Sequence, residues 1–455
     1  MKKISIVITL TIAVLAALPL IGNKFVSNTL NERVAQMKQY GLNIQETKEQ
    51  NGYLSSSKHY EFVVDDAAKF LEYLNQYATN QIPPYVDSVV NGVVVGVDVG
   101  YTNIPFFSSV EVDIYPLELA PEMTQSIKHD DPNFYDQLHT FLGAKGMNYH
   151  INYHLTSKQF EGYIKDIDQN FQLKDKTDFN IVLSDAKFSG EGELIAPVSS
   201  NLDLGKLNVH IESKNSRFTF NVEGLHTRSD FLSKATYKTD MSLKNFKFVL
   251  DEKYDDVYMK FSDVKVEFGS DDTQDTATIW AVSGFKEMVL KNSELDLLVK
   301  NFNYKIELSK LDKESFEKLQ TLLAQQNGYT NNTVAKDLEA SVKTLLAKGL
   351  RLNIENLSLE NIVYNNNKDY KGLVLNAVFD LKADQDNGAK LQNSPIQLLE
   401  NVTMDSRLQI SKEIYAEMLN NGVDLAQYAQ MQDDTVVFKS VFKDSHLSIN
   451  GKTIQ

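Results

Sequence analysis

The chain contains no cysteine and a single tryptophan among its 455 residues. Without cysteine there are no disulfides, no thiol nucleophile and no thiolate metal site. An oxidising compartment therefore tolerates such a chain well.

Basic clusters are also lacking. Lysine and arginine total 46 against 61 aspartates and glutamates, which gives a formal net charge of −15. A protein that binds nucleic acid or lies on an anionic leaflet needs a basic stripe to meet phosphates, so we exclude nucleic acid as a partner. With 42% hydrophobic and 24% charged residues, the composition is that of an ordinary folded chain.

Catalytic motifs are missing as well, since there is no Gly-x-Ser-x-Gly elbow, phosphate loop or HExxH helix. His150 and His154 are four residues apart, but their neighbours Asn152 and Tyr153 favour a strand, on which that spacing is too wide for one ion. The sequence predicts no enzyme, no cofactor and no catalytic, cofactor-binding or metal-binding residue.

An acidic cluster lacks the alternating ligands and fixed glycine of a calcium loop, and we interpret it as a solvated hairpin turn. Its members are Asp271, Asp272 and Asp275.

One long apolar run is present, from Ile4 to Gly22, after Lys2 and Lys3. It is long enough to cross a bilayer, and the short basic head favours leaving the amino-terminus in the cytoplasm. A cleaved signal is the alternative, but Leu20 occupies a position where cleavage after Gly22 needs a small residue. We expect an uncleaved signal anchor, a transmembrane helix over residues 1–24.

Roughly 430 residues remain, too many for one compact core, so we expect two lobes or one elongated body. The predicted class is α+β, predominantly β, with long curved antiparallel sheets and a few amphipathic helices packed on them. We divide the chain into the anchor (1–24), an N-terminal α+β part (25–148), an antiparallel meander (149–310) and a C-terminal α+β part (311–455).

Apolar residues at helical spacing predict five helices, and a shorter one is expected after Gly422. They cover Ser27–Tyr40, Asp65–Asn80, two segments of a helical hairpin between Leu311 and Lys348, and Ser411–Asn421. Period-two alternation predicts strands elsewhere, including a closing pair at Thr435–Phe442 and Leu447–Ile449.

A weak repeat runs through the strands: an apolar residue, one spacer, then Gly, Asn or Asp, then a second apolar residue. It occurs at Val222–Leu225, Leu243–Phe246, Phe261–Val264, Val282–Phe285, Val299–Phe302 and Ile354–Leu357. Two apolar residues three apart point to opposite faces of a regular strand unless an inserted residue shifts the phase, and Gly, Asn and Asp tolerate such a bulge. We favour long kinked strands in a curved meander, with ordinary turns as the alternative.

Gly92, Gly96 and Gly100 recur at every fourth position around the valine-rich run Val89–Val99. The valines favour a strand, on which the three glycines share a bare face. This strip either packs under a helix or receives an acyl chain or another backbone.

The chain resembles the YdgA family of Gram-negative inner-membrane proteins over nearly its whole length. The resemblance is carried by the basic head and anchor, by Asn51–Ser57 (Asn-Gly-Tyr-Leu-Ser-Ser-Ser), and by the tail from Asp434 through the Asn-Gly-Lys turn at Asn450–Lys452. A His-Gly-Pro segment of relatives is replaced here by Tyr101–Phe106. The resemblance implies a single-pass protein of the bacterial inner membrane, with the bulk of the chain in the periplasm and no established catalytic residues.

Two classes of function fit these observations. The favoured one is a non-enzymatic envelope interaction or scaffold protein that contacts itself, as a homodimer, or another envelope protein. The alternative is a periplasmic module that binds or transfers a lipid or another hydrophobic ligand on a concave sheet face. An apolar groove open along the sheet would favour the lipid-binding class, whereas a closed core with conspicuous apolar surface elsewhere would favour the scaffold.

Overall fold

The computed structural model describes most of the chain after residue 26. The described residues are 27–28, 30–32, 34–75, 86–104, 109–194, 196–233, 236–252, 255–324, 332–365, 368–423 and 425–454. Within them, no helix is both long and apolar enough to cross a bilayer. The expected anchor at residues 1–24 lies outside the described residues. The chain forms two compact units, residues 1–214 and 215–455, which we describe one at a time.

The first unit is built on an antiparallel sheet. Its strands are β1 (Leu42–Asn51), β2 (Ser55–Val64), β3 (Val94–Thr102), β4 (Ser109–Glu118), β5 (Tyr149–His154), β6 (Gln159–Ile164), β7 (Ile167–Gln172), β8 (Asp178–Ser184), β9 (Ala186–Glu193) and β10 (Ala196–Glu212). Pairing runs β1-β2-β3-β4-β5-β6, then β6 pairs with β9 and β7 with β8, and β10 pairs with β9 along its first half and with β8 along its second.

The described helices of this unit are α2 (Ala67–Asn75), α3 (Asp87–Val90), α4 (Pro121–Asp130) and α5 (Pro132–Gly143), and a 3₁₀ turn, η2, covers Lys174–Lys176. Residues 27–39 are also helical where described, and Leu30, Val34 and Met37 pack on the core formed by β1–β4 and α2. The sequence did not predict α4 and α5. Both begin with proline at the first helical position, and the Asp131 carboxylate caps α5 by accepting from the backbone amide of Phe134 at 2.9 Å.

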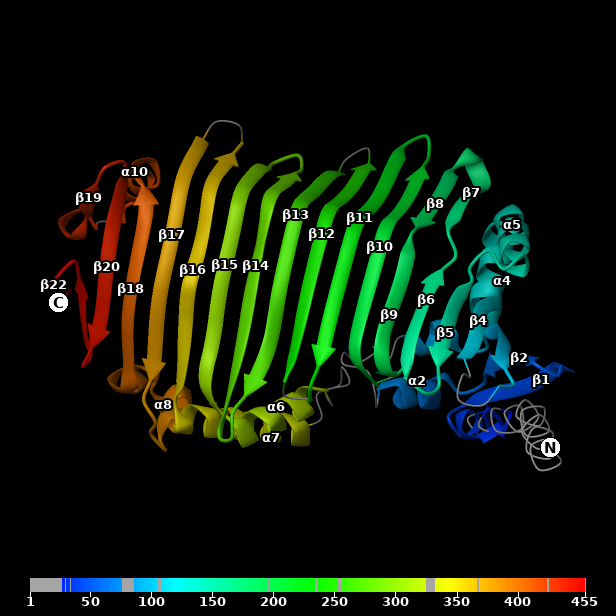
Figure 1. The fold of residues 1–455 in the computed structure, drawn as a ribbon. Coiled ribbons are helices and arrows are strands. Elements are labelled where there is room, and N and C mark those ends of the chain that lie inside the picture. Colours follow the sequence, from blue (N-terminus) through cyan, green and yellow to red (C-terminus); the bar gives the residue numbers. More distant parts are fainter. Residues whose placement is uncertain are drawn as a thin grey trace, which may run out of the picture. The chain divides into compact units, whose positions relative to one another are not determined.

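The second unit is a long antiparallel meander (Figure 1). Its strands are β11 (Ser216–Phe231), β12 (Tyr237–Glu252), β13 (Asp255–Asp272), β14 (Thr276–Lys291), β15 (Asp296–Asp312), β16 (Leu350–Tyr364), β17 (Lys368–Leu381), β18 (Val402–Ser411), β19 (Gln430–Gln432), β20 (Thr435–Lys443), β21 (His446–Ile449) and β22 (Lys452–Thr453). From β11 to β18 every strand pairs with the next one in sequence, and β20 follows β18.

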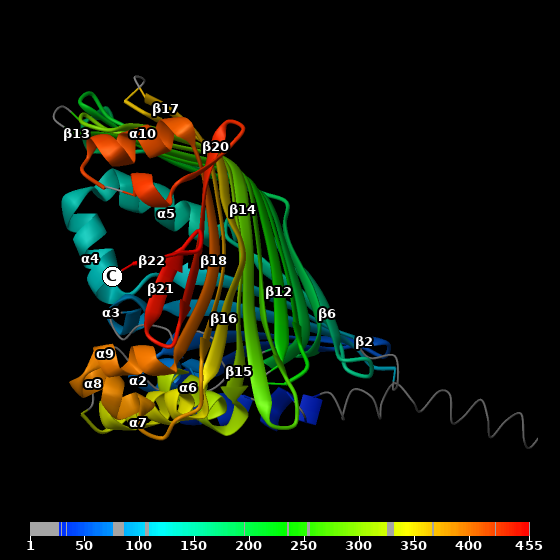
Figure 2. The same ribbon diagram turned by 90° about the vertical axis from the view of Figure 1, so that its left-hand side faces the viewer.

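Helices of this unit contact the ends of its strands. They are α6 (Lys313–Ala324), α7 (Asn332–Lys348), α8 (Asn387–Asn393), α9 (Pro395–Leu398) and α10 (Lys412–Asn420), with 3₁₀ turns η3 (Leu399–Asn401) and η4 (Ala426–Tyr428). The pair α6 and α7 packs on β14 and β15, whereas α10 packs on β17, β18 and β20. Figure 2 shows α10 and the group α6–α9 near opposite ends of these strands, on the same side of the sheet. We call the sheet surface on this side the inner face.

Each long strand from β11 to β17 is kinked near its middle. Residues with positive φ mark the kink on every second strand: Gly224 on β11, Asp263 on β13, Asn301 on β15 and Gly372 on β17. The registers place Lys244, Lys286 and Glu360 of the intervening strands opposite them. We call these seven positions the kink row.

The repeat seen in the sequence therefore marks the kink on four of these strands, and the predicted long antiparallel strands are confirmed. Among the predicted motifs, an inserted residue is confirmed only at Ile354–Leu357. Ile354 and Leu357 are three residues apart on β16, whereas the residues opposite them are two apart on each neighbouring strand. Along the kink row the registers of neighbouring strands continue unchanged, because every strand kinks at the same level. Two assignments were misplaced: on β14 the kink lies at Lys286, after the predicted motif Val282–Phe285, and on β16 it lies at Glu360, after the predicted motif Ile354–Leu357.

Other expectations also have clear outcomes. The helices predicted over Asp65–Asn80, between Leu311 and Lys348, and over Ser411–Asn421 are confirmed within the described residues, as are the closing strands. The acidic cluster lies at the β13–β14 hairpin, as predicted. The strand predicted over Val89–Val99 is wrong in its first half, because α3 covers Asp87–Val90 and β3 begins only at Val94. The division into four segments stays a prediction.

Candidate functional site

In the first unit, four ionisable side chains form one row across neighbouring strands. The registers place His59 of β2 opposite Asp98 of β3, Asp98 opposite Asp113 of β4, and Asp113 opposite His150 of β5. Directly opposed residues of a sheet share a face and lie close enough to interact. The row therefore brings two carboxylates side by side with an imidazole at each end.

The carboxylate of Asp98 has partners on both oxygens. His59 Nδ1 lies 2.5 Å from Oδ1, while the hydroxyl of Tyr115 donates to Oδ2 at 3.0 Å and Lys145 Nζ lies 2.5 Å from the same oxygen. Partial burial raises the pKa of Asp98, but the hydrogen bonds from Lys145, His59 and Tyr115 outweigh it and lower the pKa overall. The ammonium of Lys145 also lies 4.1 Å from the centre of the Tyr115 ring.

The carboxylate of Asp113 is held in a similar way. Asn148 Nδ2 donates to its Oδ1 at 2.8 Å, and His150 Nδ1 lies 2.9 Å from the same atom. The imidazole of His150 stacks on the ring of Tyr163 at 4.9 Å. Both carboxylates are thus occupied by neighbours in the sheet, which is an arrangement that cross-links strands. His150 lies on a strand, as predicted, and within the described residues no group of three ligating side chains is placed to hold a metal.

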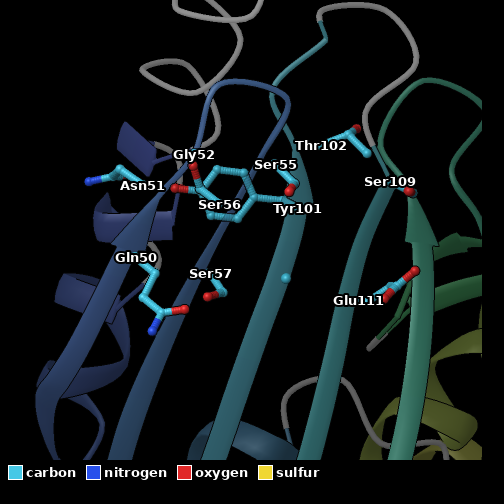
Figure 3. A pocket seen from close by; sticks show the side chains of 11 residues that line it. Gln50, Asn51, Gly52, Ser55, Ser56, Ser57, Tyr101, Thr102, Ser109 and Glu111 are labelled. Atoms are coloured by element: carbon cyan, nitrogen blue, oxygen red, sulfur yellow. The ribbon is translucent and has the colours of Figure 1, made fainter.

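A shallow hollow of about 590 Å³ lies next to this row, among the ends of β1, β2, β3 and β4 (Figure 3). It is lined by Gln50, Asn51, Gly52, Ser55, Ser56, Ser57, Gly100, Tyr101, Thr102, Ser109 and Glu111. Hydroxyl and amide groups dominate this lining, and Glu111 is the one carboxylate among these described residues. The hollow includes most of the segment that carries the family resemblance.

The three glycines of the predicted strip have different surroundings. Gly92 lies in the turn before β3 with φ of +79°, and a Cβ there would come within 2.5 Å of Pro121. A Cβ on Gly96 would come within 2.5 Å of the Tyr115 ring, which covers it. Only Gly100 is open, with Glu111 Cβ at 4.0 Å, and it lines the hollow. The strip is therefore not one bare face: Gly92 lies outside the strand, and Gly96 packs under an aromatic ring.

In the second unit, phenylalanine rings form a continuous line across five neighbouring strands, which we call the phenylalanine ladder. Its members are Phe220, Phe246, Phe261, Phe285 and Phe302 on β11 to β15. Successive ring centroids are 5.6, 6.1, 5.7 and 5.2 Å apart. These spacings are those of direct aromatic contacts.

The kink row explains how the ladder stays on one face. Phe285 stands opposite Val264, yet its ring contacts Phe261, so Phe261 and Val264 share a face although they are three residues apart. The registers extend this arrangement to every strand from β11 to β17. The pairs that flank the kink are Val222/Leu225, Leu243/Phe246, Phe261/Val264, Phe285/Met288, Val299/Phe302, Leu359/Ile362 and Tyr370/Leu373.

The ladder lies on the inner face. On β15, Tyr304 contacts Phe302, and Leu308 lies on the same face because it is an even number of residues away from both. Leu308 packs against α6 and α7. At the other end of the row, Leu373 packs into the cluster under α10. The ladder rings are only partly buried, and Phe268 on the same face of β13 is 39% exposed. An apolar line of this length is thus left partly uncovered between the helices.

The outer face of the same strands differs in chemistry. Ion pairs join neighbouring strands there, as between Lys238 and Glu267 at 3.3 Å and between Lys260 and Glu287 at 3.0 Å. Kink-row side chains such as Lys286 are largely exposed. Sequence reasoning found four of the seven pairs that flank the kink but did not see that they align into a ladder, since alignment depends on register between strands.

A family model described as "Bacterial protein of unknown function (DUF945)" matches residues 1–455. Comparison with curated proteins and with solved structures gave no match. A role has to be inferred from the residues of this chain.

Proposed function

This chain belongs to the DUF945 family, and we propose that it binds the acyl chain of a lipid along the inner face of residues 215–455. The observation that carries the proposal is the phenylalanine ladder, an apolar line that remains partly exposed in the folded chain. Soluble surfaces rarely expose continuous apolar patches unless they bind something.

The dimensions of the ladder suit an acyl chain. Strands of a sheet lie about 4.8 Å apart, so five strands give a line of about 19 Å. One leaflet of a bilayer is about 15 Å of hydrocarbon, half of its full core of about 30 Å. A single extended chain therefore matches the ladder in both length and polarity.

The scaffold role favoured by the sequence comes second. Strand addition at a sheet edge needs an open, uncharged edge strand. The edge strand β1 of the first unit instead carries Glu46, Lys48 and Glu49, and Glu46 and Glu49 pair with Lys58 at 3.0 and 3.3 Å. Charges of this kind are a common protection against edge-to-edge pairing.

The proposal also includes the cellular location of the protein. With residues 1–24 as an anchor in the bacterial inner membrane, the body would meet lipid on the periplasmic side, and the membrane itself would be both partner and source of the ligand. Neither a cofactor nor an enzymatic step is part of this function.

The test is native mass spectrometry of the full-length protein purified from membranes in detergent. We expect co-purifying lipid with the unchanged chain, and a loss of about tenfold in bound lipid for the double variant Phe246→Ser with Phe285→Ser. Val282→Ser, on the outer face of the same strand β14, is the matched control and should keep the lipid. Lipid that is equally retained by the ladder variant, or a defined dimer without lipid, would contradict the proposal and favour the scaffold.

A further inference from the structure

The apolar row of the inner face ends under a helix. Leu359 on β16 stands opposite Leu373 on β17, Leu373 opposite Ile410 on β18, and Ile410 opposite Val436 on β20. Exposure falls along this line, from partly exposed residues on β11–β16 to 1% for Ile410 and none for Val436. The open row therefore continues directly into a closed core.

The helix that closes it is α10. Its first turn is fixed by Ser411, whose hydroxyl accepts from the backbone amide of Ile414 at 3.2 Å. Tyr415 is 7% exposed and its ring lies 6.1 Å from that of Phe438. Ile414 and Met418, one turn apart, are only partly buried and pack against the same cluster as Leu373. These two side chains belong to the boundary between the open row and the core.

We infer that α10, through Met418, is an end stop that sets the length of acyl chain the inner face accepts. This inference rests on the proposed function. A chain lying along the row from the β11 side meets Leu373 and then the side chains of α10, where the apolar line has no further space. Each methylene that finds room contributes binding energy, and one that does not must displace packed side chains.

Met418 is chosen for the test because its side chain is flexible. Methionine is unbranched and fills irregular gaps, so shortening it opens space without removing the aromatic packing of Tyr415 on Phe438. Truncation to alanine should make room for about two methylene groups, which corresponds to a change of about tenfold in relative affinity.

The experiment uses the full-length protein in detergent with lauric, myristic, palmitic, stearic and arachidic acid as probes, each competing against a fluorescent fatty acid. We expect the unchanged chain to show a cut-off in chain length, and Met418→Ala to move that cut-off to longer acids by about tenfold in relative affinity. Met418→Phe, which adds bulk at the same place, should move it to shorter acids. Leu419→Ala is the matched control, since Leu419 is 37% exposed on the same helix.

The outcomes separate the two proposals. Binding that depends on the ladder but shows the same length profile in Met418→Ala, Met418→Phe and Leu419→Ala would overturn the end stop and leave the proposed function intact. No binding of any acid to the unchanged chain would overturn both. A thermal unfolding midpoint near that of the unchanged chain shows that each variant is folded, and the opposite directions expected for alanine and phenylalanine keep the inference testable with either one.

Discussion

Phe285 faces Val264 across the sheet, yet its ring lies 5.7 Å from that of Phe261, three residues earlier on the same neighbouring strand. A regular strand would send Phe261 and Val264 to opposite faces. The kink at Asp263, with φ of 51°, turns both to the inner face. This relationship, repeated across β11–β17, is what concentrates apolar side chains on one side of a sheet that is polar on the other.

The conformation at Asp263 predicts how substitutions there behave. A left-handed backbone costs a non-glycine residue about 1–2 kcal/mol, and more when the side chain is β-branched. We expect Asp263→Val to lower the free energy of unfolding by about 1–2 kcal/mol and Asp263→Gly to leave it within about 0.5 kcal/mol. Chemical denaturation of the two variants measures this. Equal stabilities would show that the kink does not depend on the residue's conformation.

Gly96 and Gly100 form a matched pair on β3. Alanine at Gly96 would place Cβ 2.5 Å from the Tyr115 ring, whose hydroxyl donates to Asp98, so we expect a loss of about 1–3 kcal/mol in unfolding free energy. Alanine at Gly100 meets only Glu111 Cβ at 4.0 Å and should be neutral or slightly stabilising. Thermal unfolding of both variants tests the difference. A destabilised Gly100→Ala would argue that the hollow needs a glycine there.

Acid should weaken the second unit through Asp384. Hydrogen bonds from Lys390 at 2.7 Å, from the amide of Asp386 and from Asn401 lower the pKa of Asp384 from 3.8 to about 2. A carboxyl group whose folded pKa is depressed stabilises the fold above its unfolded pKa, and this contribution is lost as pH falls from about 4 to about 2.

The variant Asp384→Asn should therefore lose less stability than the unchanged chain between pH 5 and pH 2, when unfolding is followed by urea titration at each pH. The neighbour Asp386→Asn serves as the control and should follow the unchanged chain. If both variants show the same slope against pH, Asp384 is not the group responsible.

The single tryptophan reports on the outer face. Trp280 stands opposite Gly269, and a Cβ at Gly269 would come within 2.5 Å of the indole. We expect Gly269→Ala to displace the ring, shift its fluorescence maximum to longer wavelength and lower stability by about 1–3 kcal/mol. Saturating fatty acid should leave the fluorescence of the unchanged chain at its starting value, because the ladder lies on the other face. A large ligand-induced shift would contradict that assignment of faces.

Local patterns predicted most of the elements. Period-two alternation located the long strands, and apolar stripes located α2, α6, α7 and α10, because burial of one side leaves a direct mark in the sequence. The helix α4 escaped notice since its stripe is weak and none of its residues is buried. Its proline start, together with the Asp131 cap of α5, was the signal that could have revealed the pair.

The candidate site was harder to predict. The motif pairs at Phe261 and Val299 were found in the sequence, but the pair Phe285/Met288 was not, because its kink residue is Lys286 rather than glycine, asparagine or aspartate. Alternate strands follow the bend of their neighbours without a positive φ of their own. Which residues meet across strands depends on register, and register is a property of pairs of strands rather than of any single segment.

Among the described residues, strands β12 to β17 of the meander pair with their sequence neighbours, so one hairpin can be gained or lost there without disturbing any other pair. Each hairpin adds about 10 Å, two strand spacings, to the apolar line. The fold is in this respect modular, like a repeat protein, with α10 as its terminal cap. A duplication of one hairpin, such as β13 with β14, would lengthen the binding face in a fixed step while leaving its end wall untouched.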